Sequence, residues 1–234
     1  MEGELAAYAW MYHSVEDIAE DPYDVTVSPA RLDDQLRWLR RRGLRGVSMG
    51  ELVAASGTPE ARRMVALTFD DGYTDFITEV LPALDRHGCT ATAFVLAGRF
   101  GGSNEWDRPG PVKPLMTREQ VRAAEAAGVE IGSHGLRHVR LSQVGAAEMA
   151  HEVTHSRAVL ADLLGHDIAG FCYPYGDLDD RVTAAVRDAG YAYAAATVHA
   201  TPGDPYTIPR IFVGDRDTPW RLRAKAARHR LRWR

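Results

Sequence analysis

The sequence contains little cysteine. Only Cys89 and Cys172 occur in 234 residues, and they are far apart rather than in a C-x-x-C pair. Small disulfide-bonded domains carry several closely spaced cysteines, so we do not expect a disulfide framework here. Two reduced thiols are the simpler interpretation.

Two further features are missing from the sequence: an excess of positive charge and a long apolar run. The formal net charge of −4 argues against a general nucleic-acid binder. The first ten residues, MEGELAAYAW, contain neither a basic stretch nor a long apolar segment. We therefore expect no signal peptide, no membrane-spanning helix and a cytoplasmic location.

What remains is an ordinary globular composition, 45% hydrophobic and 26% charged. Strand-like and helix-like segments alternate, from a buried strand at residues 64–69 to a last strand at residues 208–213. Helices are predicted at residues 75–87, ending at Gly88, at 117–127, beginning with a capping box of Thr117 and Gln120, and at 142–164. About seven such steps predict an α/β fold with a parallel sheet, either open or closed into a barrel. Residues 98–114, rich in Gly and Pro, interrupt the alternation and are predicted to be a functional insertion.

One histidine pair matches the H-E-x-x-H zinc motif of metalloproteases. It is HEVTH, with His151, Glu152 and His155. In the predicted helix, however, the apolar stripe runs through Val153, and both histidines fall on the opposite side. No glutamate follows Glu152 to supply a third ligand. We therefore interpret HEVTH as a solvent-exposed helix face.

A second pair, His134 and His138, lies in the sequence VEIGSHGLRH. His134 comes just after a predicted strand, where α/β folds expose side chains to ligands. If the turn enters a helix, the two histidines share one face, as residues i and i+4 do. The pair is then a candidate for metal binding; the alternative is two surface or capping histidines.

Two adjacent carboxylates, Asp70 and Asp71, follow the strand at residues 64–69 and precede Gly72. At a strand end with a glycine turn, both side chains can reach one pocket. Neighbouring carboxylates repel each other unless a cation separates their roles, so one could bind metal while the other accepts a proton. The alternative is an ordinary turn, in which Asp and Gly are common.

Three segments together resemble the motifs of a known family, the polysaccharide deacetylases (carbohydrate esterase family four, with a NodB-like domain). They are TFDDG at 68–72, SHGLRH at 133–138 and YPYG at 173–176. Their order and spacing agree with the family, and the resemblance spans most of the chain. It implies a distorted (β/α)7-type barrel in a single domain, residues 1–234, that removes an acetyl group from an N-acetylated amino sugar.

The resemblance also implies roles for individual residues. Asp71, His134 and His138 would hold one divalent metal ion, most often Zn²⁺, with Co²⁺, Ni²⁺, Mn²⁺ or Fe²⁺ as alternatives. Asp70 would be the general base. The backbone N–H of Tyr175 would donate to the tetrahedral oxyanion.

The sequence departs from the family pattern at two places. An arginine usually precedes the proline of the third motif and orients the catalytic aspartate; this chain has Cys172 and Tyr173 there. The acid histidine usually follows a Leu-x pattern, which the context of His199, Thr-Val-His, matches weakly. The orienting cation and the general acid therefore have to be sought elsewhere.

Two residues are candidates for these roles. His13 follows the first strand, at the same end of the sheet as Asp70, and we predict it to be the acid ahead of His199. Arg210 lies in a late apolar strand, where burial without an anionic partner is costly, and Asp70 is a natural partner. The alternatives are that His13 only caps a strand and that Arg210 pairs with a structural carboxylate.

Substrate contacts are predicted in two places. In the insertion, Trp106 can stack on a sugar ring, and Asn104 and Asp107 can bind hydroxyl groups; the alternative is a loop fixed by a buried Trp. In the third motif, Tyr173, Pro174 and Tyr175 are expected to line the site.

The chain ends in a basic helix at about 217–234, with seven Lys or Arg from position 221 onward and no acid. It is either a peripheral contact with anionic lipid, phosphate or a partner, or a frayed end.

Three functions are compatible with the sequence. The first is a metal-dependent deacetylase of a small glycoside, sugar conjugate or oligosaccharide, since without an export signal a cell-wall polymer is the less natural target. The second is an amidase with the same metal site that acts on a non-sugar amide, a cyclic imide or a ureide. The third is a non-catalytic carbohydrate-binding module of the same fold, which predicts no bound metal.

Overall fold

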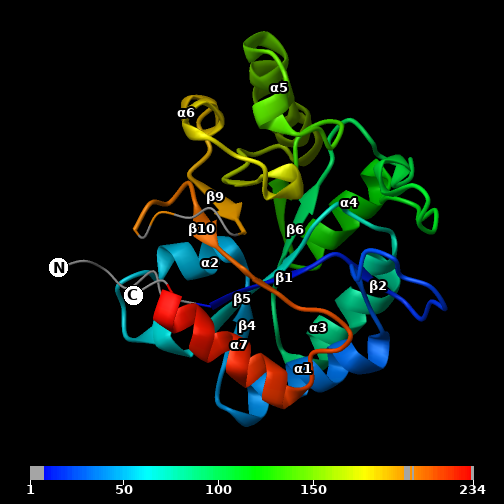
Figure 1. The fold of residues 1–234 in the computed structure, drawn as a ribbon, viewed down its shortest axis with the longest axis vertical. Helices are drawn as coiled ribbons and strands as arrows, with labels where there is room; N and C mark the ends of the chain where they lie inside the picture. The colour runs from blue at the N-terminus through cyan, green and yellow to red at the C-terminus, as the bar shows by residue number, and fades with distance from the viewer. Residues whose placement is uncertain (1–7, 198–200, 202, 233–234) are drawn as a thin grey trace.

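Parallel strands form a nearly closed ring at the centre of the fold, with most of the helices around its outside (Figure 1). The structure is a computed structural model that describes residues 8–197, 201 and 203–232. The strands are β1 (Tyr8–Tyr12), β2 (Ser14–Val15), β3 (Thr26–Val27), β4 (Arg45–Val47), β5 (Met64–Phe69), β6 (Thr92–Val95), β7 (Glu130–Ser133), β8 (Gly170–Cys172), β9 (Tyr193–Ala196), β10 (Ile208–Pro209) and β11 (Ile211–Phe212). The α-helices are α1 (Pro29–Arg41), α2 (Met49–Ala54), α3 (Leu81–His87), α4 (Arg118–Ala126), α5 (Ala146–Leu164), α6 (Asp180–Asp188) and α7 (Pro219–Arg232).

The ring is closed by one short segment, residues 208–212. Its first half, β10, pairs with β9, and its second half, β11, pairs with β1, so the strand order runs β10-β9-β8-β7-β6-β5-β1-β11. The single predicted strand at 208–213 is therefore divided, and the break falls at Arg210. The expected barrel is confirmed, and Arg210 lies where the closing segment changes partners.

Both faces of the strands are buried, as expected for a parallel barrel. Along β5, Val65, Leu67 and Phe69 face the outer helices, while Ala66 faces the interior. The small helix α2 fills part of that interior, because Met49 and Leu52 pack with Ala66 in the inner core. Helix α2, strand β4 and the pair β2–β3 were not predicted from the sequence, because they are too short to show a clear periodicity.

The predicted helix boundaries hold where capping residues define them. Thr117 and Gln120 form the expected capping box of α4, and Gly88 ends α3 in a left-handed conformation. The prediction for α5 began too early, at residue 142, because Leu141–Gln143 form a separate 3-10 turn.

The insertion at residues 98–114 has a defined structure. Ser103 bridges to Pro114 in antiparallel fashion, and Leu115 bridges to Tyr73. The buried Lys113 extends from it to the β2–β3 pair, where its Nζ donates to Ser14 Oγ at 2.7 Å and Thr26 Oγ1 at 2.8 Å. These contacts hold the insertion beside the end of β1. Within the described residues, we find no helix with the length and apolar character needed to span a membrane.

Candidate active site

Three candidate metal ligands meet at the carboxyl end of the barrel. Asp71 follows β5, His134 follows β7, and His138 lies one turn further on. The Nε2 atoms of His134 and His138 each lie 3.3 Å from Oδ1 of Asp71, and one ligand atom from each residue lies within 4.8 Å of the others. All three side chains are buried. The carboxyl ends of barrel strands are where catalytic groups are usually found.

The backbone at this site is strained. Asp71, His138 and Tyr175 have positive φ values of 73°, 63° and 60°, and they are three of the four non-glycine residues with positive φ that the described residues contain. Such conformations cost on the order of 1–3 kcal/mol each and persist only where the surrounding structure enforces them. Because all three residues lie at this site, the fold loses some stability in holding them close together.

The donor set fits a divalent ion. Asp71 Oδ1 is buried and has no hydrogen-bond partner in the described part of the chain, although both imidazoles point at it. The Nδ1–H of His134 donates to the carbonyl oxygen of Cys172 at 2.8 Å, so Nε2 is the ring nitrogen that faces Asp71. Burial lowers the pKa of His138 to about 3, so this imidazole is neutral. One carboxylate and two imidazoles are a common zinc donor set.

Asp70 is held by Arg210. Nη1 and Nη2 of Arg210 donate to Oδ1 and Oδ2 of Asp70 at 2.6 and 2.7 Å, and Nη1 also donates to Oγ1 of Thr68 at 2.9 Å. Burial by itself would raise the pKa of Asp70. The charge and hydrogen bonds of Arg210 outweigh it and keep the pKa below its usual value, so Asp70 is ionised.

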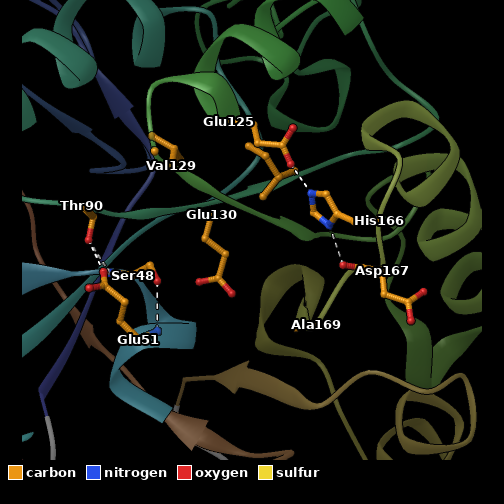
Figure 2. Close-up of a pocket in the computed structure, with 11 residues that line it drawn as sticks. Ser48, Glu51, Thr90, Glu125, Val129, Glu130, His166, Asp167 and Ala169 are labelled. Atoms are coloured by element: carbon orange, nitrogen blue, oxygen red, sulfur yellow. Dashed lines mark hydrogen bonds and ion pairs between the residues drawn. The ribbon is translucent and has the colours of Figure 1, made fainter. Parts of the chain in front are cut away.

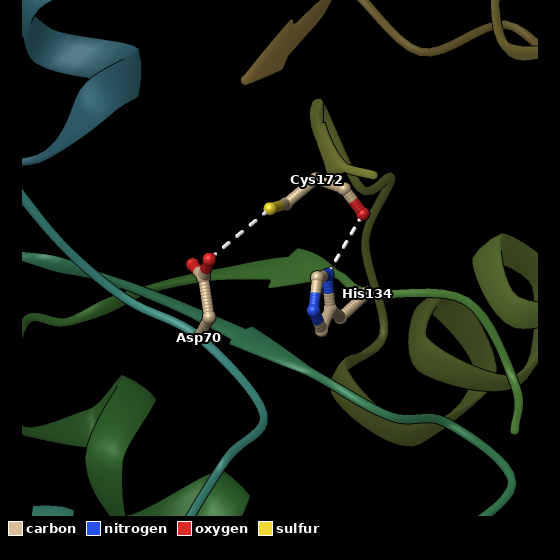
Figure 3. Close-up of side chains that lie close together, drawn as sticks. All are labelled: Asp70, His134 and Cys172. Carbon is tan, nitrogen blue, oxygen red and sulfur yellow. Dashed lines mark hydrogen bonds between the residues drawn. The ribbon is translucent and has the colours of Figure 1, made fainter. Parts of the chain in front are cut away.

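Cys172 completes this arrangement. Its thiol lies 3.4 Å from Oδ2 of Asp70, and its carbonyl oxygen accepts from His134 (Figure 3). Asp70, His134 and Cys172 could thus form a second ligand set. However, Nη2 of Arg210 lies 3.0 Å from the sulfur and 2.7 Å from Asp70. The guanidinium already supplies the positive charge at that position, so Asp71, His134 and His138 are the better candidate for a metal site.

His13 also lies beside Asp70. Its Nε2 is 4.0 Å from Oδ2 of Asp70, and its side chain is 18% exposed. It follows β1 directly, as expected, and is open enough to meet a substrate. The competing candidate, His199, falls outside the described residues.

The rim of the site is aromatic. The rings of Trp106 and Tyr175 lie 4.5 and 4.3 Å from that of His138. Tyr175 is 44% exposed, and the guanidinium of Arg140 lies 4.2 Å over its ring. Trp106 from the insertion and Tyr175 from the third motif therefore flank His138, at a place where a sugar ring could stack.

Three predicted substrate contacts are not supported by the structure. Tyr173 is buried in the outer core and donates its hydroxyl to the carbonyl of Tyr206, so it points away from the site. Pro174 is buried as well. Asn104 is 5% exposed, and its amide bonds to Lys113 N and to Pro111 O, so it holds the insertion together rather than binding sugar.

Asp107 is linked to the site by a hydrogen bond with Tyr73, which was not predicted from the sequence to be a site residue. The hydroxyl of Tyr73 donates to Oδ2 of Asp107 at 3.1 Å. Burial, followed by the nearby charge of Asp71, raises the pKa of Asp107. Tyr73 directly follows the TFDDG motif in the sequence, and this position could have identified it as a site residue.

The HEVTH segment has a structural role rather than the zinc-binding role of the motif that it matches. His151 and His155 are exposed on α5, as predicted, with their rings 4.9 Å apart. Glu152, in contrast, is 1% exposed. Its carboxylate accepts from the backbone N–H groups of Leu136 and Arg137 at 2.9 and 3.1 Å, and from Nε of Arg137 at 2.6 Å. Glu152 thus fixes the HGLRH turn between the candidate ligands His134 and His138.

A separate hollow lies beside the amino-terminal ends of β6, β7 and β8 (Figure 2). It has a volume of about 420 Å³ and carries several carboxylates. Glu51 accepts from Ser48 N, and Glu125 pairs with His166. Glu130 accepts from Gly50 N at 2.8 Å and from Tyr193 at 2.7 Å. These acids already bond to the protein, so we do not regard this hollow as the active site.

A parallel barrel with Asp71, His134 and His138 gathered at the carboxyl ends of its strands has the arrangement of a hydrolase active site. The chain belongs to the polysaccharide deacetylase family, whose model matches residues 57–194, more than half of the sequence. The resemblance drawn from the three motifs is thereby confirmed.

Individual relatives are distant in sequence. The Bacillus subtilis protein YxkH is 23% identical over 189 residues, which cover 80% of this chain and 63% of the relative. The poly-β-1,6-N-acetyl-D-glucosamine N-deacetylase of Staphylococcus aureus is 21% identical over 203 residues, which cover 81% of this chain and 68% of the relative. The Escherichia coli enzyme of the same name is 41% identical over 82 residues, 34% of this chain but 12% of that protein. The chain thus spans less than two thirds of the length of some of the relatives that it matches.

Solved structures share the fold. The Streptococcus pyogenes deacetylase PplD, in complex with acetate, superposes with a TM-score of 0.79 at 22% identity and covers 94% of this chain and 97% of that one. IcaB from Ammonifex degensii superposes with a TM-score of 0.77 at 24% identity, covering 94% and 96%. At such identities the match establishes the barrel, and the chemistry has to be argued from the residues themselves.

Proposed function

We propose that this protein is a metal-dependent N-deacetylase that hydrolyses the acetamide of an N-acetylated amino sugar. The observation that carries the proposal is the convergence of Asp71, His134 and His138 beside an ionised Asp70 that takes no part in the ligand set. A divalent ion held there would supply a Lewis acid, which acidifies water and polarises the amide carbonyl.

Asp70 is the proposed general base. Its carboxylate adjoins the ligand set and is fixed in orientation by two hydrogen bonds from Arg210. It takes a proton from the attacking water. Because Arg210 keeps the pKa low, Asp70 is in the required ionised form at neutral pH. In this proposal Arg210 is a positioning residue that replaces the third-motif arginine of the family.

The remaining groups act on the tetrahedral intermediate. The backbone N–H of Tyr175, at the strained residue beside His138, is the proposed donor to the oxyanion. His13 is the proposed acid for the departing amine, because it is partly exposed and lies 4.0 Å from Asp70. A proton accepted by Asp70 and a proton donated by His13 balance in each turnover.

The proposed substrate is an N-acetylglucosamine unit in an oligosaccharide or polymer. Two observations support it: the family relatives named as poly-β-1,6-N-acetyl-D-glucosamine N-deacetylases, and the aromatic rim formed by Trp106 and Tyr175. Aromatic faces at the mouth of a pocket suit the apolar face of a sugar ring.

Acetate release provides the test. Purified protein is incubated with β-1,6-linked N-acetylglucosamine oligomers, with N-acetylglucosamine alone and with a cyclic imide, before and after chelation. We expect acetate from the oligomers, loss with chelator and recovery with Zn²⁺ or Co²⁺. Hydrolysis of the imide alone would favour the amidase alternative. A protein that binds oligomers without metal and releases no acetate would favour the binding module.

A further inference from the structure

The last helix, α7, presents an apolar stripe to solvent. Trp220 is 77% exposed and Leu231 is 76% exposed, and Ala224 and Ala227 between them are also exposed. At 3.6 residues per turn these four positions lie within about 60° of one another around the helix axis. Large apolar side chains this exposed on one line of a helix indicate a surface that meets another apolar phase.

The stripe is bordered by positive charge on both sides. Around the helix axis, Arg221 and Arg228 follow the stripe on one side and Arg223 follows it on the other, and all three are exposed. Residues 218–234 contain no Asp or Glu, although the whole chain has a net charge of −4. This helix therefore carries a local excess of positive charge.

The opposite face of α7 attaches it to the barrel. Leu222 is buried in the main core, and Ala226 packs against it. Nζ of Lys225 donates to the carbonyl of Phe212 at 2.8 Å and to Asp217 at 2.5 Å. Helix α7 is thus packed against the fold on the outside of the molecule (Figure 1). This orientation directs the apolar stripe to solvent.

The apolar surface continues beyond the helix. Ala227 and Arg223 also line a hollow of about 290 Å³ between α7 and α1, with Trp38 and Leu44 on its other side. Arg42, at the end of α1, lies 4.8 Å over the ring of Trp38 and adds a further cation at its edge. Apolar and cationic groups thus lie side by side on α7 and at the adjoining end of α1.

We propose that this face docks the protein on an anionic lipid surface. An interfacial helix carries Trp and Leu on a narrow apolar side, which enters the boundary between headgroups and acyl chains, and Lys or Arg beside it, which contact anionic headgroups. Trp220 and Leu231 at the two ends of the stripe, with arginines on both flanks, have this arrangement. A protein partner would more often cover a broader apolar patch and would require no cations on both sides.

The proposal is independent of the catalytic assignment, because none of these residues belongs to the site. The test is co-sedimentation of the full chain with vesicles of phosphatidylcholine, alone or with about 30 mol% phosphatidylglycerol, an anionic content that attracts basic segments. We expect sedimentation with the anionic vesicles and little with the neutral ones. Trp220→Ser with Leu231→Ser, and separately Arg223→Glu with Arg228→Glu, should each weaken it by about tenfold or more.

A matched control separates this surface from a general charge effect. Arg118→Glu with Arg187→Glu makes the same change in net charge at exposed positions on α4 and α6, and it should sediment like the parent. Far-UV circular dichroism and acetate release establish that each variant is folded. No binding of the parent to anionic vesicles, equal binding to both vesicle types, or equal loss in the control would each overturn the proposal, and the first would leave a protein or glycan as the occupant.

Discussion

Arg210 contacts both carboxylate oxygens of Asp70, at 2.6 and 2.7 Å, from the point at which the closing strand changes partners between β9 and β1. A bidentate pair fixes the plane of the carboxylate as well as its charge. Because Asp70 is the proposed base, the last strand of the barrel sets the direction in which a proton is taken.

Replacing Arg210 with lysine should therefore reduce turnover. Arg210→Lys keeps the charge near Asp70 but loses the planar fork, so we expect kcat to fall by roughly 10- to 100-fold through misorientation. KM and bound metal should stay near the parent values, because neither the ligands nor the rim is altered. Steady-state kinetics with metal analysis by mass spectrometry measures all three.

Thr68→Val serves as the matched control for that variant. It removes one of the hydrogen bonds of Arg210, at 2.9 Å, and leaves the bidentate contact with Asp70 in place. We expect at most a fewfold change in kcat. An Arg210→Lys enzyme with parental kcat, or equal losses in both variants, would show that the orientation of Asp70 does not limit turnover.

Metal should stabilise the fold through Asp71. A ligand at 100 times its Kd adds about 2.7 kcal/mol, which for a chain of this length raises Tm by roughly 5–10 °C. Asp71→Asn should abolish the rise, since a neutral amide is a poor ligand. Asparagine tolerates the positive φ of 73° at this position better than most residues, so the fold itself should survive. Differential scanning fluorimetry of chelated protein, with and without Zn²⁺, is the measurement; an unchanged rise in Asp71→Asn would remove Asp71 from the ligand set.

Glu152 should control metal affinity without touching the metal. Glu152→Gln loses the charge that three donors of Leu136 and Arg137 share, so the turn between the histidines loosens. We expect affinity to fall by roughly 10- to 100-fold. His151→Ala and His155→Ala, on the exposed part of HEVTH, should leave it unchanged. Competition with a chromogenic chelator gives the affinities, and a loss in either histidine variant would revive the metalloprotease interpretation.

The role of His13 can be separated from binding by changing the leaving group. His13→Ala should lower kcat on an N-acetyl sugar by roughly 10²- to 10⁴-fold, the usual range for a missing general acid. On an aryl acetate the loss should be much smaller, because a phenolate leaves without prior protonation. Near-parental turnover of the sugar, or equal losses on both substrates, would assign the acid role to another group.

The ligand set could be predicted because it is local in sequence. Asp71 adjoins the end of a clearly apolar strand, and His134 and His138 share one glycine-containing turn. The carboxyl ends of parallel strands meet at one edge, so these neighbours had to converge. The resemblance to the family then indicated which of the two adjacent aspartates would bind metal.

Other contacts depend on tertiary packing and leave no local pattern. Tyr173 and Asn104 have the residue types expected of a sugar site, yet one points into the outer core and the other into its own loop. The strand alternation that directs Cys172 inward turns Tyr173 outward. Similarly, Glu152 became interpretable only once α5 was placed against the HGLRH turn.

A buried carboxyl beside the insertion makes stability depend on pH. Asp75 accepts from the hydroxyl of Ser14, whose oxygen also accepts from the buried Lys113. Burial is the main cause that raises the pKa of Asp75 from 3.8 to about 7, although Ser14 and Lys113 act in the opposite direction. Below pH 4 Asp75 is protonated in the folded and the unfolded chain, so it adds no pH dependence there.

Between about pH 4 and 7 the unfolded chain releases this proton and the folded one keeps it, so the native state loses about 1.4 kcal/mol per pH unit. Above pH 7 the loss is constant at roughly 4 kcal/mol. Asp75→Asn removes it, so its gain over the parent in urea unfolding should grow from near zero at pH 4 to a few kcal/mol at pH 8. Asp34→Asn, at an exposed position, controls for the deleted charge. A gain that is the same at every pH would show that Asp75 is ionised in the folded protein, and Lys113 would then be its effective counter-ion.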